Sequence, residues 1–341
     1  MGVNMEDLTT SVSTITPVYS GAAYLEKLVE EIFQIKVSWE NQKAPMRITE
    51  SIFVVDSAID NSESILNELK KKYHWVKVIT LSKNFGQHPA TMAGVLHSSG
   101  DWIITLDEDL QHHPKYFQKL FKRVSETSAD LVYAKPETVV HQALTRDLPA
   151  KTFKKTMSFL TGNKFITEFN SFRLMRGTVA RAAASVCSHE TYYDIAICWF
   201  TNRIHSETFP LVDQRYVALG KSGYSFFKLL SHARRLLVST QQKYLRVGAW
   251  MGFIAVVFSI LFGIYVLIQK IINPASVMVQ GWTSLFLSIF FWGGVSSILL
   301  SLLIEFLGNI SLHIQGKPVF FVVDRSHDEI LKQYFSASRT E

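Results

Sequence analysis

Hydrophobic and polar positions follow two different periods along the first 140 residues. Short apolar runs, each bounded by polar or turn-forming residues, predict strands at 11–18, 51–56, 75–81, 101–107 and 129–134. Between them, the three-to-four-residue spacing of apolar positions predicts helices at 21–37, 60–72, 89–98 and 114–125. Strands that alternate with helices in this way are typical of an α/β fold. We therefore expect a doubly wound, mostly parallel sheet with helices on both faces.

The pattern changes after residue 246. Val247 to Ile268 and Trp282 to Ile304 contain no charged residue, and each run is long enough to cross a bilayer as a helix. Before them, apolar and basic positions separate onto two faces of a predicted juxtamembrane helix. The expected organisation is a large domain at 1–223, an amphipathic segment at 224–246, two transmembrane helices within 247–310 (about 247–268 and 282–306), and a tail at 311–341.

Charge orients these segments relative to the membrane. Basic residues such as Arg234, Arg235 and Arg246 precede the first apolar run and Lys317 follows the second, whereas the connecting loop has only Lys270. The positive-inside rule therefore predicts a multi-pass protein of the inner membrane, with the large domain and both termini in the cytoplasm. An anionic membrane surface explains the net charge of +6 better than nucleic acid does, and we expect no nucleic-acid partner, since no base-reading motif is visible.

Two carboxylates close the apolar run at 102–106. If the strand continues, Asp107 and Asp109 share one face and Glu108 points the other way. Paired carboxylates at a strand end suit Mg²⁺ or Mn²⁺, which in turn binds a diphosphate, although a solvated acidic turn is the alternative. Ligands of doubly wound sheets bind beyond the carboxyl ends of the strands, so Asp56 and the segment 16–19 are expected in the same crevice. A dinucleotide-binding fold is disfavoured, because 17–21 lacks the Gly-x-Gly-x-x-Gly turn, and a P-loop is also missing.

Five segments, in order, resemble motifs of one enzyme family. They are Thr16-Pro17-Val18-Tyr19, Asn84 to Ala90, Asp107-Glu108-Asp109-Leu110-Gln111 with Pro114, Phe172-Arg173-Leu174, and Gly220 to Tyr224. The chain resembles the inverting family-2 glycosyltransferases with a GT-A domain. More narrowly, it is similar to the membrane-bound polyprenyl-phosphate glycosyltransferases related to dolichol-phosphate mannose synthase, from about residue 13 to residue 323.

The resemblance implies a reaction and a set of site residues. A sugar passes, with inversion, from a nucleotide diphosphate sugar (we expect UDP) to a polyprenyl phosphate such as undecaprenyl phosphate. Mg²⁺ or Mn²⁺ on Asp107 and Asp109 neutralises the leaving diphosphate. Arg173 and Arg215 are the catalytic residues expected to bind the acceptor phosphate. The other residues expected to bind substrate are Pro17, Tyr19, Asp56, Asn84, Gln111, Lys135, Lys221 and Ser222. A homo-oligomer stays open, since tetramers occur among relatives.

Some positions depart from the family pattern and keep alternatives open. Val55-Asp56-Ser57-Ala58-Ile59-Asp60 stands where the family has D-D-G-S-x-D, and His112-His113 forms a pair that is either a metal ligand set or a solvated loop. Arg173 is either a phosphate ligand or an ion-pair partner of Glu168. A processive polysaccharide synthase is disfavoured, because its Q-x-x-R-W motif is missing. A non-enzymatic sugar-nucleotide-binding protein and a transferase with another lipid acceptor remain alternatives, and the sequence does not name the sugar.

Overall fold

A seven-stranded sheet forms the centre of the α/β part of the chain. The computed structural model describes residues 9–137, 164–187, 191–210, 245–273, 281–314 and 328–337. The strands lie in the order β3-β2-β1-β4-β6-β5-β7, and β6 runs antiparallel to β4 and β5 while the other neighbouring pairs are parallel. This confirms the mostly parallel sheet. The strands are β1 (Thr10–Val18), β2 (Met46–Val55), β3 (Val76–Thr80), β4 (Trp102–Thr105), β5 (Leu131–Pro136), β6 (Arg173–Arg176) and β7 (Ile204–Phe209).

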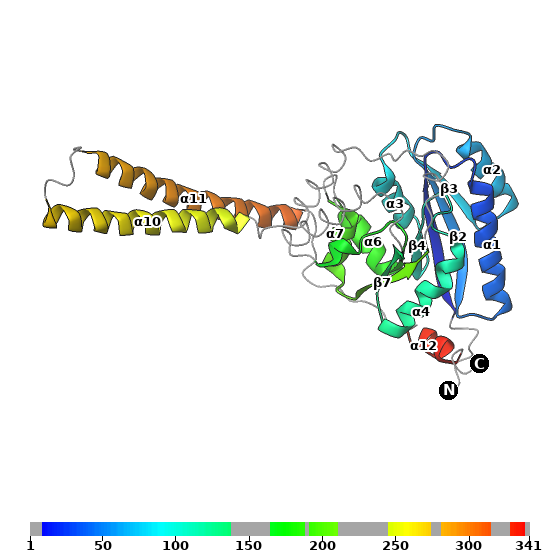
Figure 1. The fold of residues 1–341 in the computed structure, drawn as a ribbon. Helices are drawn as coiled ribbons and strands as arrows, with labels where there is room; N and C mark the ends of the chain where they lie inside the picture. Colours follow the sequence, from blue (N-terminus) through cyan, green and yellow to red (C-terminus); the bar gives the residue numbers. More distant parts are fainter. Residues whose placement is uncertain are drawn as a thin grey trace.

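Helices cover both faces of this sheet, as the sequence predicts (Figure 1). One face carries α1 (Leu25–Asn41), α2 (Ser62–Lys72), α4 (Phe117–Thr127) and the C-terminal α12 (Asp328–Ala337). The other carries α3 (Gln87–Leu96), α6 (Gly177–Val186) and α7 (Tyr193–Phe200). Two 3₁₀ turns, η2 (Pro114–Tyr116) and η3 (Lys164–Thr167), complete the described elements of this part of the chain.

The strands are apolar on both faces because each face packs against helices. Along β4, Trp102 and Ile104 enter the core beneath α1 and α4, whereas Ile103 enters the core beneath α3 and α6. The same alternation places Phe53 of β2 in the first core and Val54 in the second. Continuous apolar runs are therefore the expected signal of these central strands.

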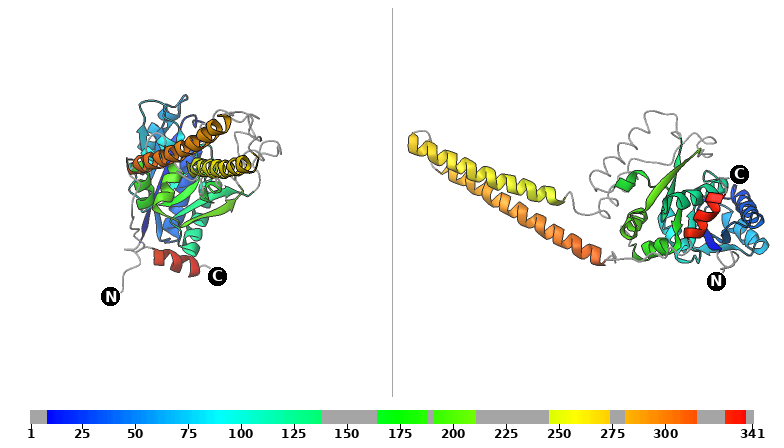
Figure 2. Two further views of the ribbon diagram at one scale, coloured as in Figure 1. Left: turned by 90° about the vertical axis from the view of Figure 1, so that its left-hand side faces the viewer. Right: turned by 90° about the horizontal axis from the view of Figure 1, so that it is seen from below.

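Two long helices extend together from the α/β body and run side by side, as Figure 1 and the right-hand view of Figure 2 show. They are α10 (Leu245–Ile272) and α11 (Trp282–Ile314), which pack against each other. Both contain stretches long and apolar enough to cross a membrane, Trp250–Gln269 and Ser284–Gly308. At about 1.5 Å per residue, the 28 residues of α10 exceed the thickness of a bilayer core, roughly 30 Å. The amphipathic segment predicted at 224–246 lies almost entirely outside the described residues.

The C-terminal tail returns to the sheet-bearing domain. Helix α12 packs on α4, and Leu331 and Phe335 are only 1% and 6% exposed in the same core that holds α1. Figure 1 shows α12 beside α4. The chain therefore contributes to its soluble core from both sides of the helical hairpin, an arrangement that the sequence prediction of a plain tail did not include.

Candidate active site

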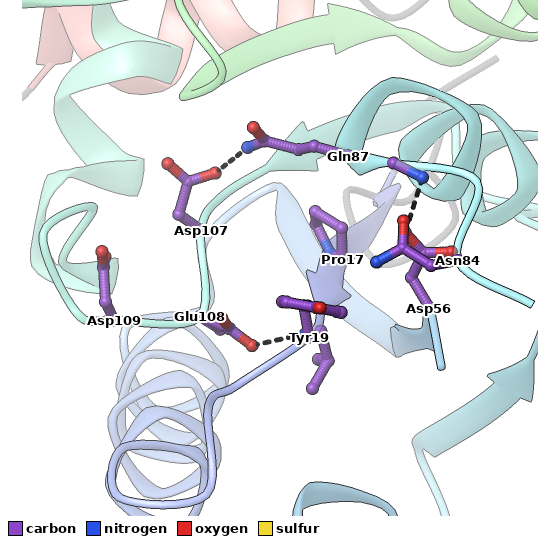
Figure 3. A pocket seen from close by; sticks show the side chains of 10 residues that line it. Pro17, Tyr19, Asp56, Asn84, Gln87, Asp107, Glu108 and Asp109 are labelled. Carbon is purple, nitrogen blue, oxygen red and sulfur yellow. Dashed lines mark hydrogen bonds between the residues drawn. The ribbon is translucent and has the colours of Figure 1, made fainter. Parts of the chain in front are cut away.

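A cavity of about 320 Å³ opens at the carboxyl ends of β1, β2 and β4 (Figure 3). It is lined by Pro17, Val18, Tyr19, Asp56, Asn84, Gly86, Gln87, Asp107, Glu108 and Asp109. These residues come from the ends of three different strands, from the loop before α3 and from the first residue of α3. The structure thus brings together the predicted carboxylates, with Pro17, Tyr19 and Asn84, in one crevice.

The turn after β4 presents Asp107 and Asp109 to this cavity. The sequence prediction of a strand through Asp107 is wrong, because β4 ends at Thr105 and residues 108–112 form a turn. Leu110 takes a left-handed backbone conformation with φ of 61° while its side chain is buried, and the Gln111 N–H donates to Asp109 Oδ1 at 3.1 Å. The two aspartates face the cavity because of this turn, not because of strand alternation.

Asp107 is held on both carboxylate oxygens. Gln87 Nε2 donates to Oδ1 at 2.6 Å, and Ser171 Oγ donates to Oδ2 at 3.0 Å. The backbone N–H of Asp107 donates to His112 Nδ1 at 3.1 Å, which leaves that ring nitrogen as an acceptor. Gln87 and Ser171 were missing from the sequence-predicted site. Their signal is positional, since Gln87 lies inside the motif-like segment 84–90 and Ser171 immediately precedes Phe172.

Glu108 turns away from its two neighbours and toward the loop between β1 and α1. Its carboxylate accepts hydrogen bonds from the backbone N–H groups of Tyr19 at 2.9 Å and Ser20 at 3.2 Å (Figure 3). Gly21 makes room for it, because a Cβ at that position would lie 2.6 Å from Glu108 Oε2. Glu108 therefore ties the acidic turn to the neighbouring loop.

Asp56 organises the third loop of the cavity. The carboxylate is 3% exposed and accepts from the backbone N–H groups of Phe85 and Gly86, each at 2.7 Å. Gly86 has a φ of 96°, a conformation that glycine adopts at little cost, and it directly precedes the first residue of α3. Asp56 thus fixes the loop that carries Asn84 and starts the helix that carries Gln87.

Comparison with known proteins places this geometry in a family. Residues 13–183, half of the chain, match the sequence pattern of glycosyl transferase family 2. The chain belongs to that family. The matched region contains most of β1, the strands β2 to β6, and every residue that lines the cavity.

Three relatives align with this family-2 glycosyltransferase over most of their length. An uncharacterised glycosyltransferase of Synechocystis is 27% identical over 93% of this chain and 96% of the relative. The SfII prophage-derived bactoprenol glucosyl transferase of Shigella flexneri is 27% identical over 93% of this chain and 98% of the relative. The undecaprenyl-phosphate 4-deoxy-4-formamido-L-arabinose transferase of Shewanella sediminis is 29% identical over 92% of both chains.

Arg173 of this glycosyltransferase does not reach the cavity, although the sequence analysis expects it to bind the acceptor phosphate. Its side chain is 2% exposed, forms a buried ion pair with Asp194, and stacks over the ring of Tyr193 at 4.9 Å. Burial opposes the charge, but the nearby Asp194 carboxylate outweighs it and raises the pKa of Arg173. Tyr133 Oη also donates to Asp194, at 2.6 Å. The β4–β6 pairing accounts for this position, because it points Arg173 into the core behind the cavity.

The remaining predicted site residues either do not line the cavity or lie outside the described part of the chain. Lys135 forms an ion pair with Glu168, so the partner that the sequence suggested for Arg173 belongs to Lys135. Gln111 contributes its backbone N–H to Asp109 but does not line the cavity. Arg215, Lys221 and Ser222 lie outside the described part of the chain.

The histidine pair splits between two structural roles. His112 is buried and stacks on Phe172 with ring centroids 5.0 Å apart. His113 Nδ1 accepts from the backbone N–H of Lys115 at the start of η2, and burial lowers the pKa of His113. Within the described ranges, no three His, Cys, Asp or Glu side chains gather into a metal-binding group. Two carboxylates still fit a hard cation, because Mg²⁺ is commonly bound by one or two carboxylates together with substrate phosphates and water.

Proposed function

We propose that this protein transfers a sugar from a nucleotide diphosphate sugar to the phosphate of a polyprenyl lipid. The observation that carries the proposal is the cavity: Asp56, Asp107 and Asp109 converge at the carboxyl edge of a family-2 domain that is joined to two membrane-length helices. The names of the aligned relatives, a bactoprenol glucosyl transferase and an undecaprenyl-phosphate sugar transferase, support the acceptor class. We expect UDP as the nucleotide.

The donor would occupy the cavity with its diphosphate near the acidic turn. A volume of about 320 Å³ lies at the lower end of the range for small-molecule pockets, roughly 300–1,000 Å³. Asp107 and Asp109 would hold Mg²⁺ or Mn²⁺, which would stabilise the negative charge that develops on the departing diphosphate. Asp56 lies at the other side of the cavity and holds the loop that would border the nucleoside.

In the proposed reaction, an oxygen of the lipid phosphate attacks the anomeric carbon. The bond between this carbon and the diphosphate oxygen breaks, the configuration inverts, and the nucleoside diphosphate leaves with the electron pair. A phosphate monoester has its second pKa near 6, so the acceptor is already dianionic near neutral pH and does not depend on a protein base. The residues of the cavity then act by binding the donor in one orientation, the one from which the diphosphate leaves.

Attachment to the membrane would bring the catalytic domain close to its lipid acceptor. We propose that α10 and α11 span the bilayer and that the soluble domain lies on the cytoplasmic side, where the basic residues flanking both helices favour it. A family-2 domain on such an anchor stays close to phosphate headgroups, which raises the effective concentration of a lipid acceptor.

A donor screen tests the proposal. Detergent-solubilised full-length protein receives undecaprenyl phosphate, Mg²⁺ or Mn²⁺, and UDP-, GDP- or dTDP-sugars, and release of nucleoside diphosphate is measured with and without the lipid. We expect lipid-dependent release from one donor and at least a hundredfold loss in Asp109→Asn. Asp101→Asn is the matched control, because Asp101 precedes β4 at its opposite end and accepts from the N–H and hydroxyl of Ser11. Binding of a nucleotide sugar without release from any donor would favour the non-enzymatic alternative.

A further inference from the structure

Asp107 differs from the carboxylates that pair with a lysine or an arginine elsewhere in the described residues. Glu50 pairs with Lys77, Asp130 with Arg176 and Asp194 with Arg173. The Asp107 carboxylate is 25% exposed at the cavity and accepts from a neutral amide and a neutral hydroxyl. No lysine or arginine of the described residues pairs with it. His112 Nδ1 lies 3.4 Å from its Oδ2, but that ring nitrogen accepts from the Asp107 backbone N–H and so does not donate to the carboxylate. Its negative charge is therefore held in place without being neutralised, which is the condition for attracting a cation.

The two neutral donors come from elements that are fixed independently of Asp107. Gln87 is the first residue of α3, and the loop before it is fastened by the two backbone hydrogen bonds to Asp56. Ser171 is fastened by Thr105, whose Oγ1 donates to the Ser171 carbonyl at 2.6 Å. Asp107 thus sits between two anchored donors, one for each carboxylate oxygen.

This arrangement leaves binding capacity on the carboxylate. Each carboxylate oxygen has two lone pairs, and the Gln87 amide and the Ser171 hydroxyl each occupy one of them. A cation can therefore bind while both hydrogen bonds persist. Partners of metal-binding carboxylates of this kind orient the ligand, and their loss commonly costs tenfold or more in metal affinity.

We propose that Gln87, together with Ser171, is a positioning residue that holds the Asp107 carboxylate ready for the divalent cation of the donor diphosphate. Gln87 acts through Asp107 and needs no contact with the sugar or the lipid. The inference rests on the donor half of the proposed function, since it requires a metal and a nucleoside diphosphate, but it is independent of the acceptor.

The test measures Mn²⁺ binding by electron paramagnetic resonance on the full-length protein in detergent, with saturating UDP and no lipid. In Gln87→Met, which removes the amide at similar length, the Mn²⁺ dissociation constant is expected to rise about tenfold. Gln34→Met is the matched control, because Gln34 Nε2 donates to Glu30 at the same 2.6 Å on the exposed surface of α1. This control is expected to stay within twofold of the wild-type value.

A second substitution separates positioning from simple loop support. Gln87→Lys retains a donor toward Asp107 but neutralises its charge, so Mn²⁺ binding is expected to be weaker than in Gln87→Met. If Gln87→Lys binds Mn²⁺ with wild-type affinity, the charge of the Asp107 carboxylate is not what attracts the cation, and the inference is overturned. A Mn²⁺ dissociation constant within twofold of wild type in Gln87→Met overturns it as well.

Failure of this inference is distinguishable from failure of the proposed function. Wild-type protein that binds Mn²⁺ with UDP but does not glycosylate any lipid refutes only the acceptor. Wild-type protein that shows no UDP-dependent Mn²⁺ binding refutes the inference directly. Gln87 is exposed, so Gln87→Met is expected to fold; if it does not, Ser171→Ala carries the same test, with an expected threefold or larger rise in the dissociation constant.

Discussion

Removal of the Arg173 guanidinium distinguishes a buried structural ion pair from a phosphate-binding residue. Arg173→Met leaves the Asp194 carboxylate buried, with the Tyr133 hydroxyl as a remaining donor at 2.6 Å. Asp194 is 2% exposed, and breaking a buried pair by removing one partner costs about 3–5 kcal/mol. For a folded unit of 150–250 residues, each kcal/mol lowers the unfolding midpoint by about 2–4 °C, so the loss is roughly 6–20 °C.

The assay is thermal unfolding of the detergent-solubilised protein, combined with steady-state kinetics for the lipid acceptor at a temperature where the variant is folded. The double variant Arg173→Met/Asp194→Leu is the control, because replacing both partners by apolar groups is often neutral. It is expected to recover most of the lost stability. The reasoning is refuted if Arg173→Met unfolds within 2 °C of wild type while the KM for polyprenyl phosphate rises tenfold or more, since that result would assign Arg173 to the phosphate.

Three further predictions concern the carboxylates of Glu108 and Glu50 and the C-terminal helix α12. Glu108→Gln weakens the hydrogen bonds to the Tyr19 and Ser20 N–H groups, so initial rates are expected to show a donor KM raised about threefold or more, with a smaller change in kcat. Burial opposes the shift, but hydrogen bonds, first from Lys77, lower the pKa of Glu50 to about 2, so its contribution to stability is complete above about pH 4.5 and is lost as the pH falls toward 2. Urea titrations of Glu50→Gln between pH 6 and 3 are expected to lack this part of the acid dependence, and an unchanged pH profile would contradict the assignment. Phe335→Ala opens a cavity between α12 and α4, with an expected loss of about 3 kcal/mol and faster proteolysis beyond residue 327; protection equal to wild type would argue against docking of α12.

The sheet and its cavity were largely predictable because they depend on local patterns. Strands buried on both faces give continuous apolar runs, and the carboxyl ends of neighbouring parallel strands meet at one edge. Asp56 and Asp107 follow two such strands, β2 and β4, and Asp109 lies two residues further along, so their convergence needed no knowledge of side-chain packing.

The partners of those carboxylates were not predictable, because they depend on long-range register. Arg173 and Asp194 are 21 positions apart, and they meet only because β6 points Arg173 to the face of the sheet that α7 covers. Glu168 is closer to Arg173 in the sequence than Asp194 is, but it pairs with Lys135 of β5. Gln87 has no feature in the sequence that marks it as a donor to Asp107, which lies 20 residues further along the chain.

The phosphate content of the lipid product tests the central claim most directly. Full-length protein would be incubated with undecaprenyl phosphate, divalent cation and the active nucleotide sugar, and the lipid and nucleotide products would be identified by mass spectrometry. The proposed reaction gives a lipid that carries the sugar through one phosphate, together with a nucleoside diphosphate. A lipid diphosphate with release of a nucleoside monophosphate, or an unmodified lipid with every donor, would contradict it.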